Sequence, residues 1–209
     1  TDSYAVKGKA LLKKEGISTQ YLVQDAERST LIKTRIITSL QPMLRFDEGT
    51  TADIGSATAG RLQEKIAIAY ANCDAVLIAD YGKGVLSPAI LNALRSLKVV
   101  QDKMIAVDSK RITLFSTLNP VLVKPNYEET IKLLSLPFYH SNRKDQLKPY
   151  GKQLTKLCQS GIIALTLDCE GSLIFQNGEL ICTISAPPVI NKHVSGAGDT
   201  YISASLLAL

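Results

Sequence analysis

The stretch HVSGAGDT, residues 193–200, is followed by the apolar run YISASLLAL, residues 201–209. It contains three small residues that permit a tight turn and leave backbone N–H groups uncovered: Gly196, Ala197 and Gly198. Asp199 comes next, in the first turn of the helix that the apolar run predicts. Because a helix N-terminus carries partial positive charge and unpaired amides, the stretch predicts an anion-binding turn beside a proton-accepting carboxylate. The alternative is an ordinary turn that joins a strand to a helix.

The composition is that of an ordinary soluble globular domain, since 45% of the 209 residues are hydrophobic and 21% are charged. No apolar run is long enough to cross a bilayer, and the first residues show neither the basic start nor the apolar stretch of a signal peptide. We therefore expect a cytoplasmic protein without a membrane partner.

The net charge of +5 permits anionic partners. The basic residues are dispersed along the chain and form no stripe interleaved with aromatic side chains. This pattern disfavours nucleic acid and favours phosphorylated small molecules.

The four cysteines are scattered without the spacing of a zinc site or a disulfide framework, and we expect buried thiols at these positions: Cys73, Cys158, Cys169 and Cys182.

The first part of the chain predicts helices separated by strands. The expected helices cover about residues 3–15 and 57–72, and the expected strands cover 20–23, 30–38 and 42–46. Within this part, residues 19–50 are a candidate small β substructure that forms a lid or borders a substrate. Lys33 and Arg35 alternate on one strand and so share a face, which borders the substrate or meets solvent.

From residue 75 onward the pattern is that of an α/β fold with a mostly parallel sheet covered by helices. Continuous apolar runs predict buried strands at residues 75–80, 104–108, 120–126 and 162–168. Helices are expected at about 87–97, 127–134, 151–159 and 200–209, and an irregular connection at 136–149. Asn177-Gly178 predicts a tight hairpin between strands at 172–176 and 179–184.

In such sheets ligands bind beyond the carboxyl ends of the strands. The segments that follow the apolar runs are polar and contain glycine, and we expect them to line one crevice: residues 80–84, 108–110, 124–129, 166–171 and 195–199.

Four motifs in this chain order, ADYGKGVLS, KPNYEE, TLDCEG and GAGDT, resemble the ribokinase-like (PfkB-type) carbohydrate kinases. The additional segments TLIKTRIIT and MLRFDEG are most similar to the heptose 7-phosphate kinase part of ADP-heptose synthases. The resemblance implies a ribokinase-like sheet sandwiched by helices, with ATP and Mg²⁺ as cofactors. It also implies transfer of the ATP γ-phosphoryl group to the anomeric hydroxyl of D-glycero-D-manno-heptose 7-phosphate, a step of lipopolysaccharide core biosynthesis.

The resemblance also implies roles for individual residues. Asp199 matches the catalytic base, and the anion hole matches Gly196, Ala197 and Gly198. Asn126 and Glu129 match the pair that holds magnesium through water, although the same two residues suit the N-terminal cap of a helix, and both roles are compatible. The remaining matches to the nucleotide site are Lys124, Thr166, Asp168, Gly171 and Ser195.

Two positions depart from the family pattern. Asp168 stands where the family usually has glycine. His193 stands where related kinases often have a cation-binding aspartate, so activation by potassium is left open. The segment that resembles the sugar-phosphate contact contains Asp80, Gly82, Lys83 and Gly84, with a simple strand-to-helix turn as the alternative. Asp108 and Lys110 are expected only to line the site.

Relative to the family, the chain looks truncated at both ends, so we expect residues 1–209 to be a partial but single kinase domain. The expected partners are a sugar phosphate and ATP, while a homodimer and a fused or separate adenylyltransferase are left open. Two alternatives also stay open: another sugar or sugar-phosphate kinase of this fold, such as a fructokinase or a hexose-phosphate kinase, and a non-catalytic module that binds nucleotide or sugar.

Overall fold

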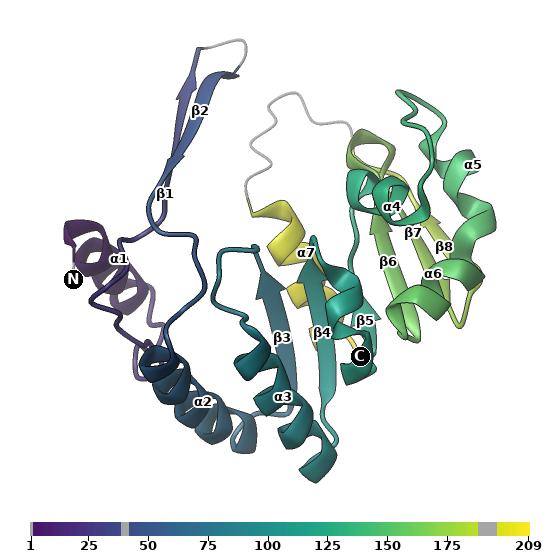
Figure 1. The fold of residues 1–209 in the computed structure, drawn as a ribbon. Helices are drawn as coiled ribbons and strands as arrows, with labels where there is room; N and C mark the ends of the chain where they lie inside the picture. Colours follow the sequence, from purple (N-terminus) through teal and green to yellow (C-terminus); the bar gives the residue numbers. More distant parts are fainter. Residues whose placement is uncertain (1, 39–41, 188–195) are drawn as a thin grey trace. The chain divides into compact units, whose positions relative to one another are not determined.

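The computed structural model describes residues 2–38, 42–187 and 196–209 (Figure 1). These residues form two compact units. One contains Thr1–Asn72 and Lys83–Ala93, and the other contains Cys73–Gly82 and Leu94–Leu209.

The first unit begins with helix α1, Ser3–Lys14, whose N-cap is Asp2. The Asp2 carboxylate accepts hydrogen bonds from the backbone N–H groups of Thr30 (2.7 Å) and Ala5 (2.9 Å). These two bonds, that of Thr30 first, lower the pKa of Asp2 to about 2. One carboxylate thus stabilises the start of the helix and joins it to the segment that leads into the first strand.

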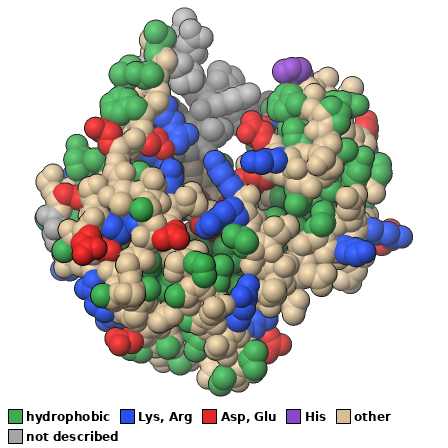
Figure 2. Space-filling view, viewed as in Figure 1, with side chains coloured by type: hydrophobic (Ala, Val, Ile, Leu, Met, Phe, Trp, Pro, Cys, Tyr) green, Lys and Arg blue, Asp and Glu red, His purple; other side chains and the backbone are tan. Residues whose placement is uncertain are grey.

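Strands β1 (Ile32–Ile37) and β2 (Pro42–Glu48) form a separate two-stranded antiparallel sheet, in which Ile32 pairs with Glu48. This confirms the strands expected at about 30–38 and 42–46. The sheet carries exposed apolar side chains, which are green in Figure 2: Ile36, Met43, Leu44 and Phe46. Helix α2, Ser56–Ala71, follows. Helix α3, Pro88–Val100, begins in the first unit and ends in the second.

The second unit contains a six-stranded sheet with the order β3-β4-β5-β6-β7-β8. The first four strands are parallel: β3 (Ala75–Asp80), β4 (Met104–Ser109), β5 (Leu122–Val123) and β6 (Ile162–Thr166). The last two are antiparallel: β7 (Ser172–Gln176) and β8 (Glu179–Ile184). The predicted α/β class and the predicted hairpin are therefore confirmed.

Helices cover both faces of this sheet (Figure 1). Helix α7 (Ala197–Leu207) packs on one face, where Ile202 and Leu206 contact the small or apolar side chains Ala106, Leu122 and Ala164. The other face bears the 3-10 helix η1 (Ile112–Leu118) and α6 (Gly151–Cys158). Because Ile105, Ala106 and Val107 are fully buried, β4 forms the centre of the core. Burial on both faces explains the continuous apolar runs of β4, β5 and β6. The expectation of a buried strand holds only in part for β3, which is first in the strand order and has Leu77 and Ala79 exposed.

Two local predictions were wrong. Residues 20–23 form no strand: Tyr21 and Leu22 are exposed, and no strand of the described residues pairs with them. Residues 136–149 are not irregular throughout, because α5 (Arg143–Leu147) and the 3-10 helix η2 (Lys148–Tyr150) lie there. The Glu170 carboxylate accepts hydrogen bonds from the first backbone N–H groups of α5, a distant contact that local sequence cannot show.

The thiols were also predicted incorrectly in part. Cys158 is buried in the core of the second unit, and burial raises its pKa to about 11. Cys73 is half-buried, whereas Cys169 and Cys182 are exposed, because they lie in the turn after β6 and on the edge strand β8.

Candidate active site

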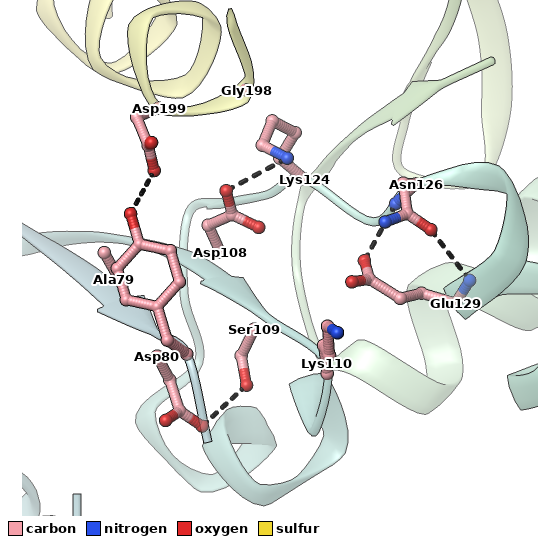
Figure 3. A pocket seen from close by; sticks show the side chains of 11 residues that line it. Ala79, Asp80, Asp108, Ser109, Lys110, Lys124, Asn126, Glu129, Gly198 and Asp199 are labelled. Atoms are coloured by element: carbon pink, nitrogen blue, oxygen red, sulfur yellow. Dashed lines mark hydrogen bonds and ion pairs between the residues drawn. The ribbon is translucent and has the colours of Figure 1, made fainter. Parts of the chain in front are cut away.

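A pocket of about 220 Å³ lies at the carboxyl ends of β3 and β4, next to the N-terminus of α7 (Figure 3). All of its lining residues belong to the second unit. They are Ala79, Asp80, Tyr81, Asp108, Ser109, Lys110, Lys124, Asn126, Glu129, Gly198 and Asp199. The volume is below the roughly 300–1,000 Å³ typical of pockets that enclose a whole drug-sized ligand, so this pocket suits the reacting end of a larger substrate.

Gly196 caps helix α7 in the left-handed conformation, with φ 84°. The first backbone bond of the helix joins the Thr200 N–H to the Gly196 carbonyl. The N–H groups of Ala197, Gly198 and Asp199 therefore precede the hydrogen-bonded part of the helix. Gly198 lines the pocket together with Asp199, so this helix N-terminus is placed to bind an anion there.

Lys124 supplies a positive charge beside these amides. Its side chain is only 6% exposed, and Nζ lies 3.0 Å from Asp108 Oδ2. A Cβ added to Gly198 would lie 3.2 Å from the same Nζ, which shows how closely the ammonium approaches the start of α7. The ion pair neutralises a lysine that burial would otherwise destabilise, and it keeps the ammonium at the pocket.

The Asp199 carboxylate accepts a hydrogen bond from the phenol of Tyr81, with Oη 2.7 Å from Oδ1 (Figure 3). This hydrogen bond is the largest cause of the raised pKa of Tyr81, which is about 12. Burial and the negative charges of Asp199 and Asp108 add to the shift. Tyr81 falls within the segment 80–84 that was expected to line the crevice, but the sequence indicated no role for it. Its position directly after the predicted strand at 75–80 was the available signal.

Asp80 is buried, and its carboxylate has several protein partners. Oδ2 accepts hydrogen bonds from Ser109 Oγ (2.9 Å) and from the Arg111 guanidinium, while Oδ1 accepts the N–H of Gly82 (2.8 Å). The side chain thus ties the end of β3 to the end of β4. Gly82 has a φ of 64°, which favours glycine in the turn that follows.

Asn126 and Glu129 form a complete capping box at the start of α4, Tyr127–Leu134. The Asn126 side chain accepts the Glu129 N–H at 2.9 Å, and Glu129 Oε2 accepts the Asn126 N–H at 3.0 Å. Burial raises the pKa of Glu129, and the negative charge of Asp108 adds to the shift. Both residues line the pocket, so the cap and a contact to a ligand are geometrically compatible.

Comparison with known proteins places this chain in a family. The family described as pfkB family carbohydrate kinase matches residues 1–209. The chain belongs to the pfkB carbohydrate kinases. It is 30% identical over 196 residues to the protein named bifunctional protein HldE of Desulfatibacillum aliphaticivorans, covering 93% of this chain and 39% of the relative. It is also 30% identical over 199 residues to the protein named bifunctional protein HldE of Helicobacter hepaticus, covering 95% of this chain and 40% of the relative.

Solved structures support the fold. A ribokinase from Giardia lamblia matches with a TM-score of 0.76 at 14% identity, covering 99% of this chain and 64% of that one. The tetrameric inhibited form of phosphofructokinase-2 from Escherichia coli matches with a TM-score of 0.70 at 20% identity, covering 99% of this chain and 66% of that one. The chain spans about two fifths of the length of the curated relatives.

Three of the predicted nucleotide-site residues of this pfkB chain are described but do not line the pocket: Thr166, Asp168 and Gly171. Thr166 forms a parallel backbone bridge with Asn126. Asp168 adopts a φ of 53° and forms an ion pair with Arg143 at 2.8 Å, so it occupies the left-handed conformation that glycine would favour. Gly171 leaves no room for a Cβ, which would lie 2.0 Å from the Ile184 carbonyl oxygen. Ser195 and His193 lie outside the described residues.

Four of the predicted substrate residues belong to the first unit: Lys83, Gly84, Lys33 and Arg35. Lys83 Nζ lies 4.0 Å from Asp47 Oδ2, and a Cβ at Gly84 would lie 1.9 Å from the Ala52 carbonyl oxygen. The glycine thus permits a close approach of two chain segments within this unit. Lys33 and Arg35 lie on β1, opposite Asp47 and Arg45 of β2. Their contact with a sugar phosphate stays a prediction.

The described residues contain no helix that is long and apolar enough to cross a membrane. They also contain no group of three His, Cys, Asp or Glu side chains that could hold a metal ion. Magnesium keeps most of its water ligands and needs only one or two protein carboxylates, so the expectation at Asn126 and Glu129 does not depend on such a group.

Proposed function

We propose that this chain carries the phosphoryl-transfer site of a sugar kinase, in which Asp199 is the base that activates a sugar hydroxyl. The supporting observation is one pocket that combines the Asp199 carboxylate, the N-terminal amides of α7 and the buried Lys124 ammonium. Membership of the pfkB family supports ATP as the phosphoryl donor.

In the proposed reaction, the sugar hydroxyl loses its proton to Asp199 while its oxygen forms a bond to the γ-phosphorus of ATP. The bond between that phosphorus and the β,γ-bridging oxygen breaks, and ADP leaves with the bonding electrons. Negative charge spreads over the transferred group in this process, and the Gly196–Asp199 turn with Lys124 is placed to stabilise it. Residues of the chain mainly position the reactants and balance charge.

Asn126 and Glu129 suit a magnesium ion, because they offer one amide and one carboxylate to a cation that prefers oxygen ligands. The raised pKa of Glu129 fits such a role, since a half-buried carboxylate gains a favourable partner when a cation binds. When bound, the ion would neutralise charge on the nucleotide phosphates.

For the acceptor, we propose D-glycero-D-manno-heptose 7-phosphate, phosphorylated at the anomeric hydroxyl to give the 1,7-bisphosphate. The supporting observations are the similarity to proteins named HldE at 30% identity and the motifs around β1 and β2. As part of this proposal, the reaction belongs to ADP-heptose formation for lipopolysaccharide. A cytoplasmic location, a homodimer and an adenylyltransferase as fused or separate partner are parts of the same proposal.

The test is a panel of acceptors supplied with ATP and Mg²⁺ to the full-length protein, with products assigned by ³¹P NMR. We expect a new anomeric phosphate on heptose 7-phosphate and much slower turnover with fructose, ribose and fructose 6-phosphate. A preference for one of these sugars would replace the heptose assignment while keeping the kinase. Binding of ATP and sugar phosphate without turnover of any acceptor would instead identify a non-catalytic binding module.

A further inference from the structure

Tyr81 reaches the candidate base from a distant part of the chain. It follows β3, and 118 positions separate it from Asp199 at the start of α7. The two side chains nevertheless share one pocket, and their oxygens are 2.7 Å apart. The contact therefore belongs to the tertiary structure of the site rather than to a local turn.

The phenol can only be the donor in this bond while Asp199 is ionised. The pKa of Tyr81 is raised to about 12, first by the hydrogen bond to Asp199 and then by burial and nearby negative charge. Tyr81 therefore keeps its proton at any pH at which a cytoplasmic enzyme works. A phenol that keeps its proton can hold a carboxylate oxygen as a hydrogen-bond donor and does not itself compete for the acceptor's proton.

The backbone that carries Tyr81 is fixed on both sides, although its side chain is 56% exposed. The preceding residue, Asp80, is held by Ser109 and Arg111, and it accepts the N–H of the following residue, Gly82. The predicted sugar-contact residue Asp80 is thus also the anchor of the Tyr81 turn. An anchored turn gives the phenol a defined position relative to α7.

We propose that Tyr81 is a positioning residue for Asp199: its phenol holds Oδ1, so that the carboxylate is fixed in orientation when the acceptor hydroxyl arrives. A carboxylate can accept about four hydrogen bonds, so one bond from Tyr81 leaves capacity for the sugar proton. The proposal rests on the proposed kinase function. Tyr81 acts through Asp199 and does not itself take the proton.

The kinetic test compares Tyr81→Phe with the unchanged full-length protein across pH 5 to 9. We expect kcat to fall by about 3–10-fold, with the KM for ATP within about twofold, because only the base is affected. A merely structural effect of the ring would disturb the shared pocket and raise the KM for ATP as well, so a fall of kcat at an unchanged KM for ATP is the readout that separates the two.

Tyr139→Phe is the matched control, because Tyr139 is an exposed tyrosine of the same unit that does not line the pocket. This control should keep the original kcat and pH profile. If the profile of Tyr81→Phe superimposes on that of the unchanged protein, the positioning role is refuted.

A second measurement does not depend on activity. In ¹³C NMR of tyrosine-labelled protein, the Tyr81 phenol should show no titration between pH 9 and 11, whereas in Asp199→Asn it should begin to titrate in that range. If the Tyr81 phenol in Asp199→Asn still shows no titration between pH 9 and 11, the positioning role of Tyr81 is overturned while the proposed kinase function stands. Retained turnover in Asp199→Asn would instead overturn the proposed base, so the two failures are distinguishable.

Discussion

At the scale of single residues, the ion pair of Lys124 and Asp108 places charge beside the amides of α7. Replacing Lys124 by Met keeps most of the volume but leaves the Asp108 carboxylate without its partner. We expect a loss of about 2–4 kcal/mol in the free energy of unfolding, measured by urea denaturation. We also expect the Kd for ATP to rise by about tenfold or more, because a charge at the phosphate site is lost.

The double variant Lys124→Met with Asp108→Asn separates the two effects. It removes both charges, so most of the stability should return while the binding of ATP stays weak. Recovery of ATP binding in the double variant would contradict a direct role of Lys124 in holding phosphate.

Gly198 is the second residue at which the structure makes a sharp prediction. Gly198→Ala should leave stability equal or raise it by up to about 1 kcal/mol, because alanine favours helix. Turnover should nevertheless fall by about tenfold or more, since the new methyl group would press on Lys124 Nζ at the anion site. Gly60→Ala in α2 is the control, as nothing lies within 4 Å of its added Cβ, and it should gain stability without loss of turnover.

The sequence was sufficient to predict that several polar side chains lie together at one edge of the sheet. Four of the expected residues do line one pocket: Asp199, Lys124, Asn126 and Glu129. It was insufficient for the role of Tyr81, because a tyrosine in a turn has no motif of its own and its partner lies 118 positions away. The same limit applies to the partners of Asp80: Ser109 ends the next strand, and Arg111 lies in the turn after it.

At the scale of elements, helix α4 combines structural stability with the proposed magnesium site. Burial raises the pKa of Glu129, so the ionised form is disfavoured in the folded state. The free energy of unfolding therefore falls as the pH rises through the raised pKa that Glu129 has in the folded protein. The loss is absent below the pKa of glutamate in the unfolded chain, about 4.3. Glu129→Gln should therefore be more stable than the unchanged protein at pH 7, with the difference vanishing near pH 4.

The glutamine can still accept the Asn126 N–H, so the capping box should survive in Glu129→Gln. Turnover of this variant should require a higher Mg²⁺ concentration. Glu128→Gln is the matched control, since Glu128 is the exposed neighbour in the same first turn. Equal Mg²⁺ requirements in the two variants would argue against the metal role of Glu129.

Elements with a strong local signal were predicted well. The buried parallel strands and the Asn177-Gly178 hairpin follow from apolar runs and turn chemistry that need no distant partner. The errors occurred where tertiary contacts decide. Helix α5 depends on Glu170 from the turn after β6, and the short apolar segment at 20–23 has no strand to pair with.

At the scale of the whole molecule, the two units differ in how much they bury. Helix α1 has no buried residues and β2 is exposed along its described side chains, whereas β4 and β6 are largely buried. In hydrogen exchange followed by mass spectrometry, we expect α1, β1 and β2 to exchange at least about tenfold faster than β4 and β6. Equal protection of all these elements would contradict this distribution of stability.

The central claim is that Asp199 accepts the proton of the acceptor hydroxyl. The most direct measurement is turnover of Asp199→Asn in the full-length protein, together with its Kd for ATP. The account predicts that kcat falls by about 10²–10⁴-fold while the Kd for ATP stays within about threefold, because the change removes a base and leaves the amides and Lys124 in place. Turnover within about threefold of the unchanged protein would contradict the claim.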